Sequence, residues 1–188
     1  MTDAQTEGRV SVGATVSRVF PTESDVRDTW TFGPLVRLNP KRGWGPAGGL
    51  GWFRADIDDP NGGGDFARLR VRPLTAGVAY TIGSDKILTS FSVVAGPSFN
   101  SIDFRDAFLQ RVAGTGAPPE IDIDNSFVVR PGVNVTVTVA PRVAIVGFGG
   151  YSFNRPDVTY RDPSGTQFRN RWKADAAAVS VAAVYSLF

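Results

Sequence analysis

The chain has 188 residues, and its net charge of +2 gives no reason to expect a nucleic-acid partner. It has no Cys and no His, which excludes disulfides, thiolate chemistry and any site built on imidazole, the commonest general base and metal ligand. No apolar run approaches the roughly 20 residues of a transmembrane helix. The 21 Gly and 13 Pro are typical of short strands joined by turns, so we expect one β-rich domain.

The first residues do not resemble a regular element. Residues 1–8 lack the apolar core of a signal peptide, and we expect them to be a disordered segment. If the native protein is exported, we expect this chain to be the mature part with a start Met added. Residues 9–188 are expected to form the single folded domain.

Eight segments then follow with the alternation of a β-strand, in which successive side chains point to opposite faces. The sixth is the clearest, because Val133, Val135 and Val137 lie on one face and Asn134 and Thr136 on the other. In chain order, the predicted strands span about 9–20, 29–38, 44–57, 67–82, 87–100, 127–140, 142–154 and 169–188.

Two of these strands change phase along their length. In the third, the apolar parity shifts between Trp52 and Phe53, which predicts a β-bulge. In the fourth, the apolar positions move near Pro73, from the phase of Leu69 to the phase of Leu74. The pattern of the fourth strand therefore leaves open which of its faces points inward.

The connections alternate between short, turn-rich ones and longer ones. In an up-and-down meander, all the long loops then lie at one end, and an even number of strands can close into a barrel that has no edges. The sequence therefore predicts an all-β fold, an eight-stranded antiparallel up-and-down barrel. The short turns are at 39–43, 83–86 and 140–141, and the long loops are at 21–28, 58–66, 101–125 and 155–168.

A barrel of this kind can be soluble, with its apolar face inward, or can span a membrane, with that face toward lipid. The polar face here consists of Ser, Thr, Gly and Asn, which suit a narrow interior, and the apolar stretches have the length of tilted membrane strands. Aromatic residues gather near both strand ends, as two interfacial belts would require. These features favour the membrane barrel. The belt at the long-loop end would contain Phe20, Trp30, Phe53, Phe99, Phe127, Phe153 and Trp172, and the other Trp44, Tyr80, Tyr185 and Phe188.

Three stretches, Arg42–Asp58, Arg72–Gly83 and Val181–Phe188, make the chain resemble small outer-membrane β-barrel proteins of Gram-negative bacteria, of the broad OmpA/OmpW-like class. The resemblance implies a monomer in the bacterial outer membrane, with short periplasmic turns and long extracellular loops. It also implies two partners, the lipid bilayer and, during biogenesis, the barrel-assembly machinery. Tyr185 and Phe188 would form the assembly signal, although in this chain Tyr185 shares its face with Leu187 and not with Phe188.

The known enzymes among small outer-membrane barrels rely on a His, which this chain lacks. We therefore expect no enzymatic activity and no resident cofactor. The nearest approach to a cofactor site is an acidic, Gly-rich turn that suits Ca²⁺, although it lacks the spacing of a calcium loop and the bidentate Glu, and a solvated hairpin loop remains the alternative. Its oxygen ligands would come from Asp56, Asp58, Asp59, Asn61 and Asp65.

Four arginines could project into the interior near the long-loop end, with two aspartates as partners, because a charge in a narrow interior must be paired. The pairs would form a rigid plug of salt bridges, which we favour, or an anion-selective constriction. The residues concerned are Arg68, Arg70, Arg72, Arg130, Asp56 and Asp175.

The predicted function is structural or interaction-based, and it is carried by the extracellular loops. One of these loops should contain a short amphipathic helix at 103–113, with Asp103 as its N-cap. Two alternatives stay open: a narrow, porin-like pore or hydrophobic-solute conduit of the OmpW type, and a soluble lipocalin-like carrier with the valine face inward.

Overall fold

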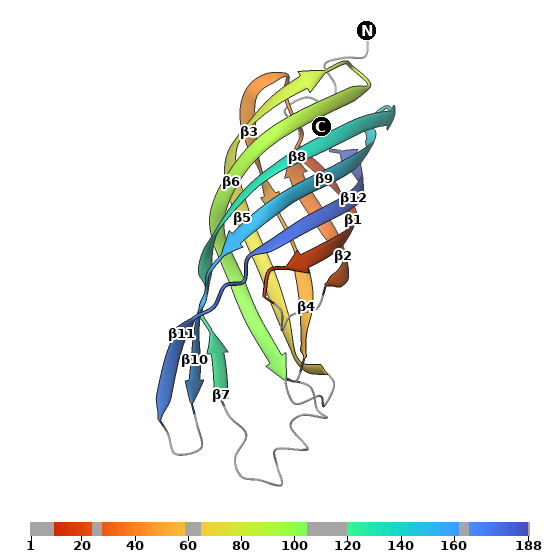
Figure 1. The fold of residues 1–188 in the computed structure, drawn as a ribbon. Helices are drawn as coiled ribbons and strands as arrows, with labels where there is room; N and C mark the ends of the chain where they lie inside the picture. Colours follow the sequence, from red (N-terminus) through yellow and green to blue (C-terminus); the bar gives the residue numbers. More distant parts are fainter. Residues whose placement is uncertain (1–9, 24–27, 59–64, 105–119, 162–165, 188) are drawn as a thin grey trace.

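The computed structural model describes residues 10–23, 28–58, 65–104, 120–161 and 166–187, and most of them belong to one closed barrel (Figure 1). Within these residues there is no helix long and apolar enough to cross a membrane. The barrel strands are β1 (Val10–Pro21), β2 (Thr29–Leu38), β3 (Gly43–Leu50), β4 (Phe53–Asp58), β5 (Asp65–Gly83), β6 (Ile87–Phe104), β8 (Ser126–Ala140), β9 (Val143–Asn154) and β12 (Ala176–Ser186).

These strands form one antiparallel sheet in the order β3-β2-β1-β12-β9-β8-β6-β5-β4, and β3 also pairs with β5. β3 and β4 are therefore two segments of the third barrel strand, which gives eight strands in all. The first and last strands close the barrel, with Ser11 opposite Ser186 and Pro21 opposite Ala176. The predicted eight-stranded antiparallel barrel is confirmed.

The outside of the barrel is apolar. On β8, Phe127 is 66% exposed and Val135 39%, whereas Val128 and Thr136 on the other face are 1% and 8% exposed. Such a surface would be unfavourable in water, because far more contiguous apolar area is exposed than a soluble monomer shows. Facing hydrocarbon, it is stable, so the valine face points to lipid and the soluble carrier is excluded.

Aromatic side chains mark both ends of this apolar band. At the short-turn end, Trp44 is 74% exposed and packs against Tyr80, with 5.3 Å between the ring centroids. Tyr185 of β12 is exposed at the same end, as is Leu187, which follows the strand. At the other end, the exposed aromatics include Trp30, Phe32, Phe99, Phe127 and Phe153.

Neither predicted phase change is a shift of register. The third strand is interrupted at Gly51 and Trp52, but β3 and β4 continue one common register along β5. On β5, the residues of odd number from Ala67 to Thr81 are buried on both sides of Pro73, except the half-buried Gly77. The faces of the fourth strand therefore do not exchange at the proline, and the expected bulge at Trp52 is a break in the strand.

Three further strands extend three of the barrel strands beyond the long-loop end: β7 (Glu120–Ile123), β10 (Asp157–Arg161) and β11 (Gln167–Arg171). They form a separate antiparallel sheet in the order β11-β10-β7, seen at the lower left of Figure 1. Parts of the loops predicted at 101–125 and 155–168 are thus strands. Asp103 belongs to β6, so it does not cap a helix, and residues 105–113 of the predicted helix lie outside the described residues.

Candidate functional site

The barrel encloses a cavity of about 200 Å³ that is lined from nearly every barrel strand. Small side chains leave this space open, because an eight-stranded barrel is otherwise filled by its own interior residues. The lining is mostly apolar or small, and it carries two charged groups, Arg37 from β2 and Arg130 from β8.

Arg130 is held by an aromatic ring inside the lumen. Its guanidinium carbon lies 5.2 Å from the centroid of Phe148 on β9, a cation–π contact. The ring in turn lies over Gly132 and Gly150, which face each other across β8 and β9, and a Cβ on either glycine would come within 2.5 Å of it. Two glycines thus create the recess for Phe148, and Phe148 supports Arg130.

Arg130 also reaches across the lumen. A Cβ built on Gly51, on the opposite wall, would lie 3.5 Å from Arg130 Nη1. Arg37 donates from Nε to the carbonyl oxygen of Leu38 at 3.4 Å. In the described part of the chain, neither Arg37 nor Arg130 forms an ion pair with a carboxylate. The lumen therefore contains two cations with no protein counter-ion in that part of the chain.

The predicted partner, Asp175, is occupied elsewhere. It is buried at the long-loop end of the barrel, where its Oδ1 accepts a hydrogen bond from the Asn154 backbone N–H at 2.8 Å. Its Oδ2 lies 3.6 Å from Arg155 Nη2. The expected salt bridge between Asp175 and the lumen arginines is therefore wrong, because the carboxylate already has two partners of its own.

Three of the four predicted lumen arginines point the other way. Arg68, Arg70 and Arg72 alternate with the buried residues of β5, so they lie on the outer face of the barrel. Arg70 pairs there with Asp103, with 2.9 Å between Nη2 and Oδ2. The side chain of Asp56 lies outside the described residues, although its backbone is opposite Arg68. A plug of salt bridges from these arginines is thus a wrong prediction.

A polar chain crosses the inner wall between the cavity and the long-loop end. Ser98 donates to Asn100 Oδ1 at 2.9 Å, and Asn100 Nδ2 donates to Ser126 at 2.9 Å. Ser126 donates to Asn154 Oδ1, and the backbone N–H of Asn154 donates to Asp175 Oδ1. These bonds link β6, β8, β9 and the start of β12, and they satisfy polar groups that would be costly if left unpaired.

An apolar cluster lies on the same side, beyond the polar chain. It is built on Leu69 and Val71 of β5 and Ile123 of β7. Trp172 packs against this cluster. The prediction that Trp172 belongs to the outer aromatic belt is therefore wrong. Val71 belongs to the cluster and also lines the cavity, so the cluster bounds the cavity toward the long loops.

Within the part of the chain that the structure describes, the barrel wall has a weak seam between β2 and the third strand. β2 and β3 share two register pairs, Val36 with Leu50 and Arg37 with Gly49, and β4 pairs with β5 alone. The neighbouring β1 and β2, in contrast, pair from end to end. Leu50, Gly51 and Trp52 line the cavity, and Leu50 and Trp52 are also exposed on the outside, so the seam is the part of the wall that lies between the cavity and the lipid.

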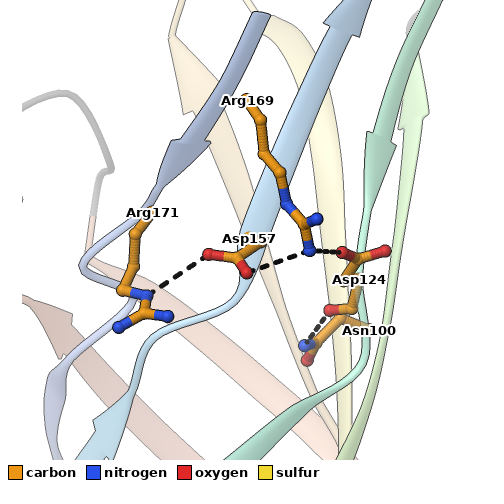
Figure 2. Close-up of polar contacts among 5 residues, drawn as sticks. All are labelled: Asn100, Asp124, Asp157, Arg169 and Arg171. Carbon is orange, nitrogen blue, oxygen red and sulfur yellow. Dashed lines mark hydrogen bonds and ion pairs between the residues drawn. The ribbon is translucent and has the colours of Figure 1, made fainter.

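A chain of ion pairs lies outside the barrel, at the sheet formed by β7, β10 and β11, which we call the extension. Figure 2 shows Asp157 of β10 between Arg169 (3.1 Å) and Arg171 (3.3 Å) of β11, while Arg169 also reaches Asp124 at 2.9 Å. Asn100 of β6 donates to the Asp124 carbonyl oxygen at 3.0 Å. The extension is thus fastened to the barrel through Asn100.

The predicted calcium ligands are not tested by this geometry. The backbones of Asp56 and Asp58 belong to β4 and that of Asp65 to β5, and their side chains, with all of Asp59 and Asn61, lie outside the described residues. Elsewhere in the described chain, no three acidic residues come together as a metal site. The calcium site stays a prediction, as does the assembly signal at Tyr185 and Phe188, since Phe188 is also outside the described residues.

Sequence reasoning identified Arg130 as a lumen residue and missed Arg37. The signal for Arg37 was present, because it lies on the polar face of its strand with Thr31 and Gly33, opposite Phe32 and Val36. The positions of Gly132 and Phe148 were not visible, because the glycine recess forms only when β8 and β9 are paired.

No family model matches the sequence, and no curated protein matches it significantly. Solved structures of bacterial outer-membrane proteins do match over almost the whole chain. OprG from Pseudomonas aeruginosa is 11% identical, with a TM-score of 0.70 and coverage of 100% of this chain and 99% of that one. OmpW from E. coli is 18% identical (TM-score 0.58, coverage 96% and 98%), and Ail from Yersinia pestis 14% (0.53, 96% and 99%).

At these identities the likeness concerns the fold, and it agrees with the lipid-facing valines, the aromatic belts and the closed antiparallel sheet described above. The chain therefore has the fold of a small bacterial outer-membrane β-barrel of the OmpW/OmpA-like class.

Proposed function

We propose that this barrel is a non-enzymatic conduit of the outer membrane for small, largely apolar solutes that carry an anionic group. The observation that carries the proposal is the combination of an apolar cavity of about 200 Å³ with two arginines that have no counter-ion in the described chain. A cavity of this size suits a molecule built on one ring or a short alkyl chain.

The arginines determine the charge of the solute. An ionised side chain at membrane depth is costly unless it is paired or solvated, so such residues generally mark a solute path. Arg130 is supported by Phe148 and extends across the lumen, so an anion beside it gains a charge-assisted hydrogen bond where the protein offers no carboxylate. A cation of the same shape would meet two like charges.

The seam suggests how such a solute enters. The apolar cluster of Leu69, Val71 and Ile123 bounds the cavity toward the long loops, whereas Leu50 and Trp52 line it at the seam and are exposed on the outside. A solute that has accumulated at the bilayer surface would therefore enter between β2 and β4 and continue toward the short-turn end.

A matched pair of permanent ions tests the proposal, because neither crosses a bare bilayer readily. Benzenesulfonate and trimethylanilinium have similar shape and opposite charge. We expect vesicles that contain the barrel to take up benzenesulfonate and to exclude trimethylanilinium, and the Arg130→Gln variant to slow uptake about tenfold. Arg171→Gln, far from the lumen, is the control and should leave uptake unchanged. Equal entry of both ions, or entry of neither, would exclude the conduit.

A second candidate is the interaction role, and the extension formed by β7, β10 and β11 favours it. All five residues of β11 are exposed, and Phe168 is followed there by Arg169 and Arg171, a composition typical of protein interfaces. Adhesion of cells that express the wild type or a Phe168→Ser variant tests this role. Unchanged adhesion at equal surface amounts of protein would exclude it.

A further inference from the structure

The outer wall of β4 and β5 carries a group of arginines at the edge of the apolar band. Arg70 and Arg72 project outward from β5. Arg54 of β4 is exposed and lies opposite Arg70. We call Arg54, Arg70 and Arg72 the outer arginine group. It lies on the outer face of the barrel, apart from the lumen arginines, and it meets the seam through the contact of Arg72 with Trp52.

The level of this group relative to the bilayer follows from the strand register. Arg72 is opposite Phe99, an exposed member of the aromatic belt, and Leu74, two residues further toward the short turns, is exposed in the apolar band. Since a strand rises about 3.4 Å per residue, Arg70 lies roughly 7 Å along the strand beyond Arg72. Arg72 is thus at the level of the belt, and Arg70 and Arg54 are at the level of lipid headgroups.

Among the described residues, one carboxylate pairs with this group, which leaves its positive charge only partly balanced. Asp103 pairs with Arg70 at 2.9 Å, and Arg72 stacks on the Trp52 ring, with 4.8 Å from its guanidinium carbon to the centroid. Arg54 and Arg70 are directly opposite, an arrangement of like charges that is unfavourable on its own. In the described chain, the Nε atoms of Arg70 and Arg72 are buried and have no hydrogen-bond partner.

The net charge identifies the ligand class. Among the described side chains, three guanidinium groups and the Asp103 carboxylate leave two positive charges. A phosphomonoester carries about 1.5 to 2 negative charges at neutral pH, and its oxygens accept the paired donors of guanidinium groups. The acyl chains of a lipid that carries such a headgroup would lie along the exposed surface of Leu74 and Phe99.

We propose that the outer arginine group binds the phosphomonoester headgroup of a bilayer lipid in the leaflet at the long-loop end. The lipid phosphate separates the facing guanidinium groups of Arg54 and Arg70 and neutralises them, and its chains extend the protein's contact with the apolar band. A single lipid is thus held at a fixed position beside the seam that contains Trp52.

The test uses two anionic lipids that differ in the phosphate. The barrel is placed in phosphatidylcholine vesicles with a minor fraction of phosphatidic acid, a phosphomonoester, or of phosphatidylglycerol, a phosphodiester. After extraction, bound lipid is counted by native mass spectrometry. We expect the wild type to retain phosphatidic acid about tenfold more than phosphatidylglycerol, and a variant with Arg54→Gln, Arg70→Gln and Arg72→Gln to lose this preference.

A double variant, Arg169→Gln with Arg171→Gln, changes two exposed arginines of the extension and should keep the preference. Heat-modifiable migration in gels checks that each variant is folded. Added inorganic phosphate should not displace the lipid, since it has no chains to bury. Equal retention of both lipids by the wild type, a preference that survives in the triple variant, or full displacement by inorganic phosphate would each overturn the proposal.

Discussion

Arg130 stacks on Phe148 inside the barrel, with 5.2 Å from its guanidinium carbon to the ring centroid, and this contact determines where the charge stands in the lumen. The ring can lie there because Gly132 and Gly150 leave the wall behind it open. An arginine without that support would have several rotatable bonds to order before it could bind a solute, at a cost in entropy. The glycine recess therefore affects the site although neither glycine can contact a solute through a side chain.

The recess makes Gly132→Ala informative. The new Cβ would lie 2.5 Å from Phe148 Cε2, so the ring must move and Arg130 loses its support. We expect the free energy of unfolding to fall by about 1–3 kcal/mol, as for other overpacked sites, and benzenesulfonate uptake to slow. Gly149→Ala is the matched control, because nothing lies within 4 Å of its Cβ position, and its unfolding free energy should change by no more than about 0.5 kcal/mol. Equal effects of the two substitutions would contradict the recess.

The lipid-facing side of β8 can be tested by introducing a charge at two depths. Val135→Arg, within the apolar band, should reduce the free energy of folding into vesicles by about 2–4 kcal/mol, and Val139→Arg, near the short turn, by about 0–1 kcal/mol. Both valines are exposed on the same outer face, so their difference reports depth alone. Folding is measured by urea titration in the presence of vesicles. A larger penalty for Val139→Arg than for Val135→Arg would contradict the assignment of Val135 to the middle of the apolar band.

The seam can be closed by a disulfide. A Cβ on Gly33 would lie 3.6 Å from the Trp52 Cβ, within the roughly 3.5–4.5 Å range that disulfides require. In the double variant Gly33→Cys with Trp52→Cys, we expect the bond to form under mild oxidation, to stabilise the barrel by about 2–4 kcal/mol, and to slow solute uptake. Adding a reductant to the same protein is the control and should restore uptake. If uptake is the same in both redox states, solutes do not enter through the seam.

The buried carboxylate of Asp175 should stabilise the barrel mainly through Oδ1, which accepts the hydrogen bond from the Asn154 backbone N–H. Asp175→Ala removes the acceptor of the Asn154 N–H at 2.8 Å and should cost about 1–3 kcal/mol, because a buried donor is left unsatisfied. Asp175→Asn keeps an oxygen at that position and loses the attraction to Arg155, which is itself largely exposed, so it should cost less than about 1 kcal/mol. Thermal unfolding in detergent measures both. A larger loss for the asparagine variant would mean that the charge, and not the hydrogen bond, stabilises this end of the barrel.

The sequence alone determined the fold class and the orientation of the barrel wall. The alternation of Val133, Val135 and Val137 with Asn134 and Thr136 is local, since a strand places successive side chains on opposite faces whatever its neighbours are. Together with even strand number and aromatic strand ends, it was enough to predict an eight-stranded barrel with its valines toward lipid.

The tertiary structure decided which way the arginines of β5 point. The apolar residues change phase near Pro73, but the strand does not: Leu69 and Val71 face inward, and Leu74 faces lipid, because the bilayer ends between them. Beyond that level the outer face meets headgroups and water, so the apolar side chains move to the inner face while the alternation continues. A sequence pattern contains parity but not depth, and for that reason the outer arginine group, the glycine recess and the seam became visible only when the strands were paired.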